Sequence, residues 1–369
     1  MKGIYIHIPF CLKKCNYCDF CSFPDMLMHQ DEYVRALSKE ASSYKGDAVL
    51  ADTVYFGGGT PSLLDAKAIE NIMNIVRDNF NISPDTEITL EANPATITKE
   101  KAKELYNTGI NRISLGAQSF IDSELLSLGR VHSSDDIEKS FYILREAGFS
   151  NISLDLMYAL PNQTMQTLTE SINKIVNLHP EHISCYGLKI EEGTPFYKML
   201  SKGQIVEKSD DEYADMYELI CSFLKSDGYI QYELSNFSLP KRASRHNLKY
   251  WLGNDYIGLG ASASSLYKNT RYTNTCVYNK YIESFAKEDV QILTKEEKMS
   301  EFMFLSLRLT SIGASKKDFL ARFGISMEEA FGDAIQKHIS NGMLLDRGDR
   351  YVLADRAYYV SNTVLCDFV

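Results

Sequence analysis

The run Cys11-Leu12-Lys13-Lys14-Cys15-Asn16-Tyr17-Cys18-Asp19-Phe20-Cys21 places four cysteines within eleven residues near the N-terminus. Its first three cysteines have the spacing C-x-x-x-C-x-x-C. Thiolate is the usual ligand of iron–sulfur clusters, so three thiolates on one short loop suit a [4Fe–4S] cubane. Such a set leaves one iron open, and an open metal position is where a substrate can bind. The loop therefore predicts a cluster held by Cys11, Cys15 and Cys18.

Two other interpretations of this loop stay open at this point. A structural zinc site would usually combine two separated C-x-x-C or Cys/His pairs, and the sequence has no second pair of this kind. A closed cluster with Cys21 as fourth ligand would serve electron transfer only. We favour the open cluster because the rest of the chain supplies a cofactor site to accompany it. Cys21 is then a neighbouring thiol and not a primary ligand.

The composition is typical of a globular intracellular protein. The chain has 369 residues, 44% hydrophobic and 24% charged, which suggests about two domains or one barrel with an appendage. Cys185, Cys221, Cys276 and Cys366 are scattered, which argues against a disulfide framework and for a reducing compartment. We expect a cytoplasmic protein without a signal peptide, because no long apolar run precedes Cys11. The net charge of −10 argues against nucleic acid as the main partner.

Short β-rich runs alternate with helical periodicity in the first half of the chain. We predict strands at Gly3–Ile8, Thr53–Phe56, Glu87–Leu90, Arg112–Leu115, Ile152–Met157 and Ile183–Leu188. We predict helices at about Asp31–Tyr44, Ala66–Phe80, Lys99–Asn107, Ser134–Ala147 and Thr164–Leu178. This alternation indicates a parallel sheet with helical crossovers.

Unusual residues follow the predicted strands at their C-terminal ends, where parallel barrels carry their chemistry. The first strand runs into the cysteine loop, the second into Gly57-Gly58-Gly59-Thr60-Pro61, and the third into Glu91-Ala92-Asn93-Pro94. The fourth leads to Gln118, and the fifth carries Asp155. These strand ends predict one active site.

Several stretches carry a resemblance to a known family. They are YIHIPFCLKKCNYCDF, VYFGGGTPSLL, EANP, NRISLGAQSF, LGRVHS and NISLDLMYALPNQT, and they occur in this order over roughly the first half of the chain. Together they resemble the radical S-adenosylmethionine (SAM) superfamily, in the branch of oxygen-independent coproporphyrinogen III oxidase. The resemblance implies an α/β fold with a partial (β/α)₆ barrel that binds a [4Fe–4S] cluster and SAM.

The resemblance also implies a role for each matched residue. The implied SAM-site residues are Tyr5 beside SAM, Tyr17 against the cluster, Gly58, Gly59 and Thr60 at the methionyl end, Glu91 at the ammonium, Arg130 at the carboxylate, and Gln118 and Asp155 at the ribose. A glycine run alone would also fit a tight strand-to-helix turn. His7, on the same strand face as Tyr5, is expected to be a hydrogen-bonded interior histidine.

The chemistry implied by this resemblance is reductive cleavage of SAM to methionine and a radical that abstracts a hydrogen atom. Such chemistry requires an electron donor. The implied partner is therefore a flavodoxin- or ferredoxin-type protein.

The second half of the chain distinguishes members of this branch. The run Arg245-His246-Asn247-Leu248-Lys249-Tyr250-Trp251 resembles the H-N-x-x-Y motif of the branch's haem chaperones, which is associated with haem binding. The matched residues are His246, Asn247 and Tyr250. A neutral imidazole is a standard axial haem ligand, so His246 is chemically suitable. The alternative is a histidine that caps or braces a strand next to the barrel.

Two departures separate this chain from the oxidase pattern. The oxidase carries an additional segment ahead of the cluster strand, whereas this chain begins at Met1, directly before the predicted strand. The oxidase also has its fourth cysteine two positions after the third, whereas Cys21 lies three positions after Cys18. The shorter N-terminus argues against a cavity that closes on a tetrapyrrole and excludes water.

The tail from about Lys295 has helical periodicity followed by a predicted β-ribbon and resembles a winged helix. Its third predicted helix carries Glu328, Glu329 and Asp333, which would repel phosphates, so we expect packing or partner docking. The expected division is a radical SAM core at 1–230, a barrel-completing segment at 231–290 and a winged-helix-like α+β domain at 291–369.

Three functional classes remain: a haem-binding and haem-transferring protein, a coproporphyrinogen III oxidase, or another radical SAM reaction such as a methyl transfer. The features after Tyr186 favour the first. The expected partners are then haem and haem-accepting proteins, with a membrane reached only through an acceptor. We expect no decarboxylation of coproporphyrinogen III.

Overall fold

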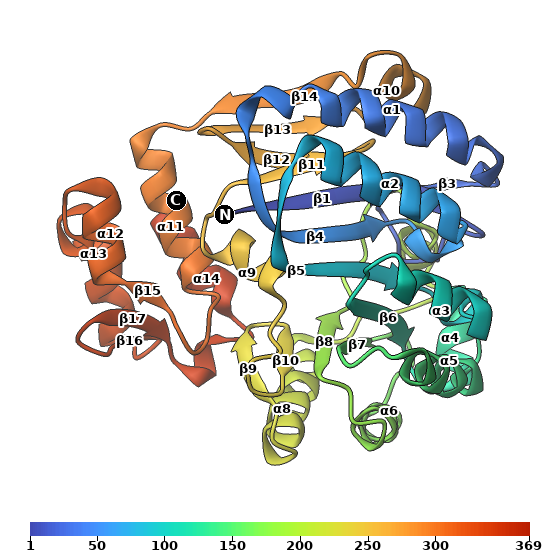
Figure 1. Cartoon of the computed structure of the whole chain (residues 1–369). Helices are drawn as coiled ribbons and strands as arrows, with labels where there is room; N and C mark the ends of the chain where they lie inside the picture. The colour runs from blue at the N-terminus through green and yellow to red at the C-terminus, as the bar shows by residue number, and fades with distance from the viewer.

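A twelve-stranded curled sheet organises the molecule in the computed structural model, which describes residues 1–369 (Figure 1). Its strand order is β14-β13-β12-β11-β1-β4-β5-β6-β7-β8-β10-β9. The parallel strands at its centre are β1 (Lys2–Ile8), β4 (Leu50–Gly58), β5 (Asn81–Ala92), β6 (Arg112–Gln118), β7 (Ile152–Tyr158) and β8 (His182–Gly187). The predicted α/β fold with a partial barrel is therefore confirmed.

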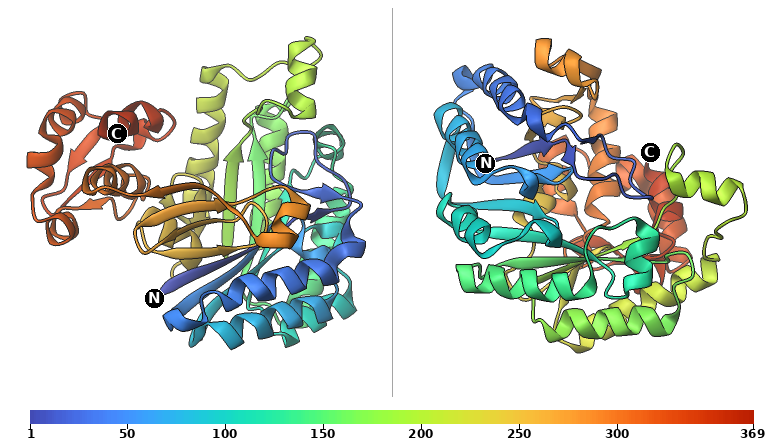
Figure 2. Two further views of the ribbon diagram at one scale, coloured as in Figure 1. Left: turned by 90° about the horizontal axis from the view of Figure 1, so that it is seen from above. Right: turned by 90° about the vertical axis from the view of Figure 1, so that its right-hand side faces the viewer.

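Helices cover the outer side of this sheet (Figure 2). They include α1 (Gln30–Ser42), α2 (Ala66–Asn79), α3 (Lys99–Asn107), α5 (Ser134–Ala147), α6 (Met165–Asn177) and α8 (Asp210–Ser226). Ile4, Ile6 and Ile8 alternate along β1 and are fully buried in the core that these helices complete. The intervening Tyr5 and His7 lie on the other face, toward the barrel interior. None of the helices has the length and apolar character needed to cross a bilayer.

Residues after β8 extend the sheet at both edges. On one side β10 (Asn236–Ser238) and β9 (Ile230–Glu233) follow β8 in antiparallel order. On the other side β11 (Tyr256–Leu259) pairs parallel with β1, and β12 (Ser264–Tyr267), β13 (Thr270–Asn274) and β14 (Lys287–Ile292) follow in antiparallel order. The short helix α9 (Arg245–Trp251) lies between these two groups in the chain.

The C-terminal elements form a smaller unit beside the sheet, red at the left of Figure 1. Its helices and strands are α11 (Lys295–Ser306), β15 (Ala314–Ser315), α12 (Lys316–Phe323), α13 (Met327–Ser340), β16 (Leu344–Asp346) and β17 (Arg350–Leu353). The strands pair in the order β15-β17-β16. Met303, Phe319 and Phe368 are fully buried in an apolar cluster centred on this unit.

Candidate cofactor site

A cavity of about 530 Å³ opens at the C-terminal ends of the parallel strands. The predicted site residues that line it are Cys11, Cys15, Tyr17, Cys18, Gly58, Gly59, Thr60, Glu91, Gln118, Arg130, Asp155 and Asn247. Tyr5 and Tyr250 instead line a neighbouring cavity of about 460 Å³, which shares Gly58 and Glu91 with the first. The fold thus brings residues from distant parts of the sequence to one place.

Asn16 holds the cysteine loop against the rest of the barrel through both its backbone and its side chain. The Asn16 backbone N–H donates to the Leu128 carbonyl at 2.9 Å, and its Nδ2 donates to the Ser127 carbonyl at 2.8 Å. These contacts anchor the loop to the end of α4 (Asp122–Leu128). Cys11, Cys15 and Cys18 are therefore presented on a fixed segment.

The three cluster cysteines are free and only partly exposed. Burial raises the pKa of the Cys11 thiol and raises that of Cys18 to about 11. A cluster held by these thiols would take them as thiolates, so their protons would be released on binding. No three Cys, His, Asp or Glu side chains converge on a single-ion position here. The cysteines instead line one side of the cavity.

The glycine run brings the end of β4 close to the cysteine loop. A Cβ on Gly58, whose φ is +114°, would lie 2.6 Å from the His7 ring. A Cβ on Gly59 would lie 2.7 Å from the Phe10 carbonyl oxygen and 3.0 Å from Cys11 Sγ. Glycine is required at both positions because no larger residue fits. The run therefore forms a tight packing contact as well as lining the cavity.

Two half-buried carboxylates face the cavity. The Tyr55 hydroxyl donates to Glu91 Oε1 at 2.9 Å and the Gly58 N–H donates to Oε2 at 3.2 Å, while burial raises the pKa of Glu91 to about 7. The Ser114 hydroxyl lies 3.1 Å from both oxygens of Asp155, whose pKa burial also raises. Carboxylates in this setting can accept hydrogen bonds from an ammonium or from hydroxyl groups.

Arg130 provides a positive charge next to the cluster loop. Its Nη2 donates to the Gly116 carbonyl at 2.9 Å, and its Nη1 lies 3.6 Å from Cys15 Sγ. Its Nε is buried and lacks an acceptor. Gln118 ends β6 at a φ of +66°, after an irregularity in the pairing with β7. A donor without a partner beside the thiols fits a cofactor with a carboxylate, so this residue set fits a cluster and SAM.

The expectation for His7 is confirmed. Its side chain is 6% exposed, and its Nε2 lies 2.9 Å from the Cys21 carbonyl oxygen. The Tyr5 hydroxyl lies 3.2 Å from His7 Nδ1, and the Tyr5 ring stacks on Tyr55 at 6.1 Å between centroids. His7 and Tyr5 therefore connect the cluster loop to the barrel wall.

The structure corrects the expectation that Cys276 is one of several scattered, unpaired cysteines. Cys21 and Cys276 form a disulfide across 255 positions of sequence, with Cα atoms 6.1 Å apart. The bond connects the cysteine loop to the segment between β13 and α10 (Tyr278–Ser284). Spacing could not reveal this pair, because only the return of the chain to β11–β13 brings Cys276 beside the loop.

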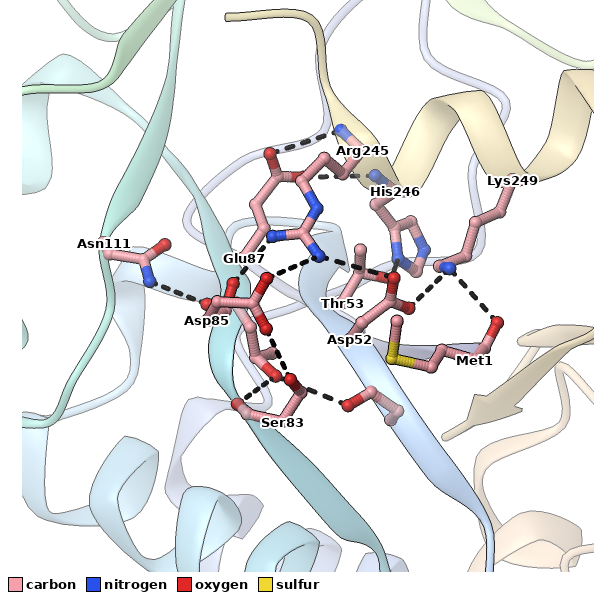
Figure 3. A network of polar contacts seen from close by, with 12 residues as sticks. Met1, Asp52, Thr53, Ser83, Asp85, Glu87, Asn111, Arg245, His246 and Lys249 are labelled. Atoms are coloured by element: carbon pink, nitrogen blue, oxygen red, sulfur yellow. Dashed lines mark hydrogen bonds and ion pairs between the residues drawn. The ribbon is translucent and has the colours of Figure 1, made fainter. Parts of the chain in front are cut away.

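Helix α9 is fixed at the opposite end of the strands by a network of charged and polar groups (Figure 3). The Glu87 carboxylate accepts from the backbone N–H groups of Arg245 at 3.2 Å and of His246 at 3.1 Å. Lys249 Nζ pairs with Asp52 Oδ1 at 2.5 Å. Because β4 and β5 carry Asp52 and Glu87, the helix is attached directly to the barrel.

His246 lies within this network. It is 1% exposed, its Nδ1 lies 2.8 Å from Thr53 Oγ1, and its Nε2 lies 2.9 Å from the Tyr250 hydroxyl. Burial lowers its pKa to about 3, so the imidazole is neutral. In this conformation neither ring nitrogen is free for iron. Asn247 lines the main cavity and Tyr250 the neighbouring one. The three residues of the motif therefore lie in three different environments.

Sequence reasoning assigned no role to Arg112, although this residue lines the same cavity. A signal was present: Arg112, Ser114, Gly116 and Gln118 alternate along β6 and therefore share a strand face. A charged residue on the face that carries the site residues could have been selected on that ground.

Comparison with known proteins agrees with this architecture. The radical SAM superfamily model matches residues 5–175, and the HemN C-terminal domain model matches residues 293–360. Among solved structures, coproporphyrinogen III oxidase (HemN) from Escherichia coli superposes with a TM-score of 0.86 over 99% of this chain and 89% of that one, at 21% identity. The fold and the cysteine-lined site thus define a radical SAM protein.

Sequence identity over the whole length then identifies the family within the radical SAM proteins. The chain is 37% identical to the heme chaperone HemW of Bacillus subtilis, over 100% of this chain and 99% of that protein. It is 35% identical to HemW of Lactococcus lactis, over 100% and 97%, and 32% identical to HemW of Escherichia coli, over 98% and 97%. The chain belongs to the HemW family.

Proposed function

We propose that this chain is a haem chaperone that holds a [4Fe–4S] cluster and SAM, binds haem and passes it to haem-accepting proteins. The observation that carries the proposal is identity of 32–37% over nearly the full length to relatives named heme chaperone HemW. The protein acts in the cytoplasm and meets a membrane only through an acceptor.

The cofactor part of the proposal assigns Cys11, Cys15 and Cys18 to three irons of the cluster. When bound, the cluster and SAM supply one-electron chemistry, which requires a flavodoxin- or ferredoxin-type donor. The chain's own groups bind and orient SAM: Tyr5, Tyr17, Gly58, Gly59, Thr60, Glu91, Gln118, Arg130 and Asp155. The fit rests on the half-buried carboxylates Glu91 and Asp155 and on the Arg130 Nε that lacks an acceptor.

The haem part of the proposal assigns His246, Asn247 and Tyr250 to haem binding. Ligation of iron by His246 would break its hydrogen bond to Thr53 or to Tyr250. His182 offers a matched control, because it is also fully buried and lies 2.8 Å from both Ser153 and Tyr232 hydroxyls. If His246 is the ligand, His246→Ala shifts the Soret band and His182→Ala does not. Identical spectra in both variants would exclude His246 as the ligand.

The second candidate is a coproporphyrinogen III oxidase, favoured by the shared fold and the complete set of SAM-site residues. One experiment separates the two. Reconstituted protein is incubated anaerobically with SAM, reductant and coproporphyrinogen III, and in parallel titrated with haem. We expect saturable haem binding and no decarboxylated product. Several turnovers to harderoporphyrinogen or protoporphyrinogen would overturn the chaperone assignment.

A further inference from the structure

Arg112 is the largest fully buried side chain of the molecule. It is 1% exposed, and it opens β6 with its side chain lining the main cavity. Its Nε is buried without a hydrogen-bond acceptor. A guanidinium is always charged, and burying one without partners costs several kcal/mol, so proteins usually pair it. A buried and incompletely paired guanidinium that lines a cavity therefore has a donor left for a ligand.

The strand register places Arg112 deeper than Glu91, Gln118 and Asp155, and level with Tyr5. It lies level with Thr89 of β5, which is level with Tyr55 of β4. Gly116, whose carbonyl holds Arg130, follows four positions later on the same strand, about 13 Å along it. The methionyl carboxylate of SAM belongs at Arg130, beside the cysteine loop. Arg112 is thus left for a different group, nearer the floor of the cavity.

Neither carboxylate of the cavity makes a hydrogen bond or a close ion pair with Arg112, although the charge of Arg112 opposes the rise in the pKa of Glu91 and of Asp155. Glu91 accepts from Tyr55 and Gly58, and Asp155 accepts from Ser114. The amide of Asn247 lines the same cavity from the other direction, out of α9. A guanidinium and an amide that line one cavity match the charge and hydrogen-bonding groups of a carboxylate, which a guanidinium binds with two parallel hydrogen bonds.

We propose that Arg112, together with Asn247, binds a carboxylate of the second ligand that enters the barrel next to SAM. The inference rests on the proposed function, under which this carboxylate is a haem propionate. The two propionates are the anionic groups of haem, and one of them would meet Arg112 at the floor of the cavity. A purely structural Arg112, which only balances the charges of Glu91 and Asp155, would not distinguish haem from a neutral ester of haem.

The test compares haem with haem dimethyl ester, whose propionates carry no charge, on the reconstituted full-length protein. We expect the wild-type protein to bind haem roughly 10- to 100-fold more tightly than the ester, the usual effect of one charged hydrogen-bonded contact. Arg112→Met keeps the apolar stem and should bind both forms equally, with SAM affinity changed less than about threefold. Arg308→Met serves as control, because Arg308 also has a buried Nε without an acceptor but packs on Trp251, away from the cavity.

Each outcome has one meaning. Equal affinity of the wild-type protein for haem and ester overturns the Arg112 site without needing any variant. Discrimination that persists in Arg112→Met, or disappears in Arg308→Met, overturns it as well. Millimolar propionate that weakens haem binding to the wild-type protein, but not to Arg112→Met, supports the carboxylate assignment. A wild-type protein that binds no haem saturably contradicts the proposed function instead.

Discussion

Buried nitrogens of two kinds face the interior of this barrel. Arg112 and Arg130 have Nε atoms without acceptors, whereas His246 and His182 have both ring nitrogens engaged. A polar group that remains unpaired in a dry interior is costly, and its natural partner is a bound molecule. At the scale of single residues, the two arginines that line the cavity have a donor left for a ligand, whereas a haem iron could reach His246 only after one of its hydrogen bonds breaks.

The first prediction concerns the cluster cysteines. Changing Cys11, Cys15 or Cys18 to Ala should abolish stable cluster assembly, because we propose that each supplies an iron ligand. Cys21→Ala should retain the cluster, since this sulfur pairs with Cys276. The iron content and the absorbance of each anaerobically reconstituted variant measure cluster assembly. A Cys21 variant that loses its cluster as completely as the others would exclude the three-cysteine assignment.

The second prediction follows from the pKa of Glu91, which burial raises from 4.5 to about 7. Only the ionised carboxylate accepts fully from an ammonium, so SAM affinity should fall by up to about tenfold per pH unit below pH 7. Stability of the unliganded protein should change in the opposite sense and fall as pH rises from 4.5 to 7, because the native state holds the extra proton. Calorimetry between pH 6 and 8 tests the first effect. Glu91→Gln should remove the pH dependence, and a variant with the wild-type profile would assign it to another group.

At the scale of elements, α9 lies at the floor of the barrel and is held there by contacts to β4 and β5. Glu87 caps its N-terminus, Lys249 pairs with Asp52, and His246 bonds to Thr53. The helix contributes one side chain to each of the two cavities, Asn247 and Tyr250. Its attachment therefore fixes the shape of both.

The third prediction concerns this attachment. Thr53→Val keeps the shape of the side chain but leaves His246 Nδ1 without its partner, which should lower the free energy of unfolding by about 1–3 kcal/mol. Urea denaturation measures the loss. Ser42→Ala is the control, because its hydroxyl bonds at the exposed end of α1 and should change stability by less than about 0.5 kcal/mol. Equal effects of the two changes would show that the His246 contact does not hold the helix.

The longer strands and helices of the core could be predicted from the sequence, and the shorter ones could not. The predicted core strands and the helix Lys99–Asn107 agree with the structure, because long alternating and helical periodicities are set locally. The strands β9 to β13 could not be identified, since runs of three to five residues carry little periodic signal. Motif spacing selected the cavity residues, but the Cys21–Cys276 pair and the partners of His246 depend on distant contacts.

At the scale of the molecule, the C-terminal unit is joined to the barrel by several kinds of contact. The Arg308 guanidinium lies 4.7 Å from the Trp251 ring centroid, and Thr310 Oγ1 donates to the Gln231 carbonyl at 2.7 Å. Leu234, from the turn between β9 and β10, is 5% exposed and belongs to the apolar cluster of the C-terminal unit. The two parts therefore share buried surface.

The fourth prediction tests this shared surface. Leu234→Ala should lower stability by about 2–4 kcal/mol, because it opens a cavity between the two parts. Leu320→Ala is the matched control, since Leu320 is 52% exposed on α12 and should have little effect. Denaturant unfolding followed by circular dichroism measures both. Similar stabilities of the two variants would show that the C-terminal unit does not depend on this contact.

The most direct test of the chaperone assignment is the transfer of haem from the loaded protein to an apo-haemoprotein, followed by the Soret absorbance of the acceptor. We expect saturable loading with haem and a transfer rate that increases with acceptor concentration, because transfer then occurs within a complex of the two proteins. A rate that is independent of acceptor concentration, equal to simple dissociation of haem, would contradict the assignment.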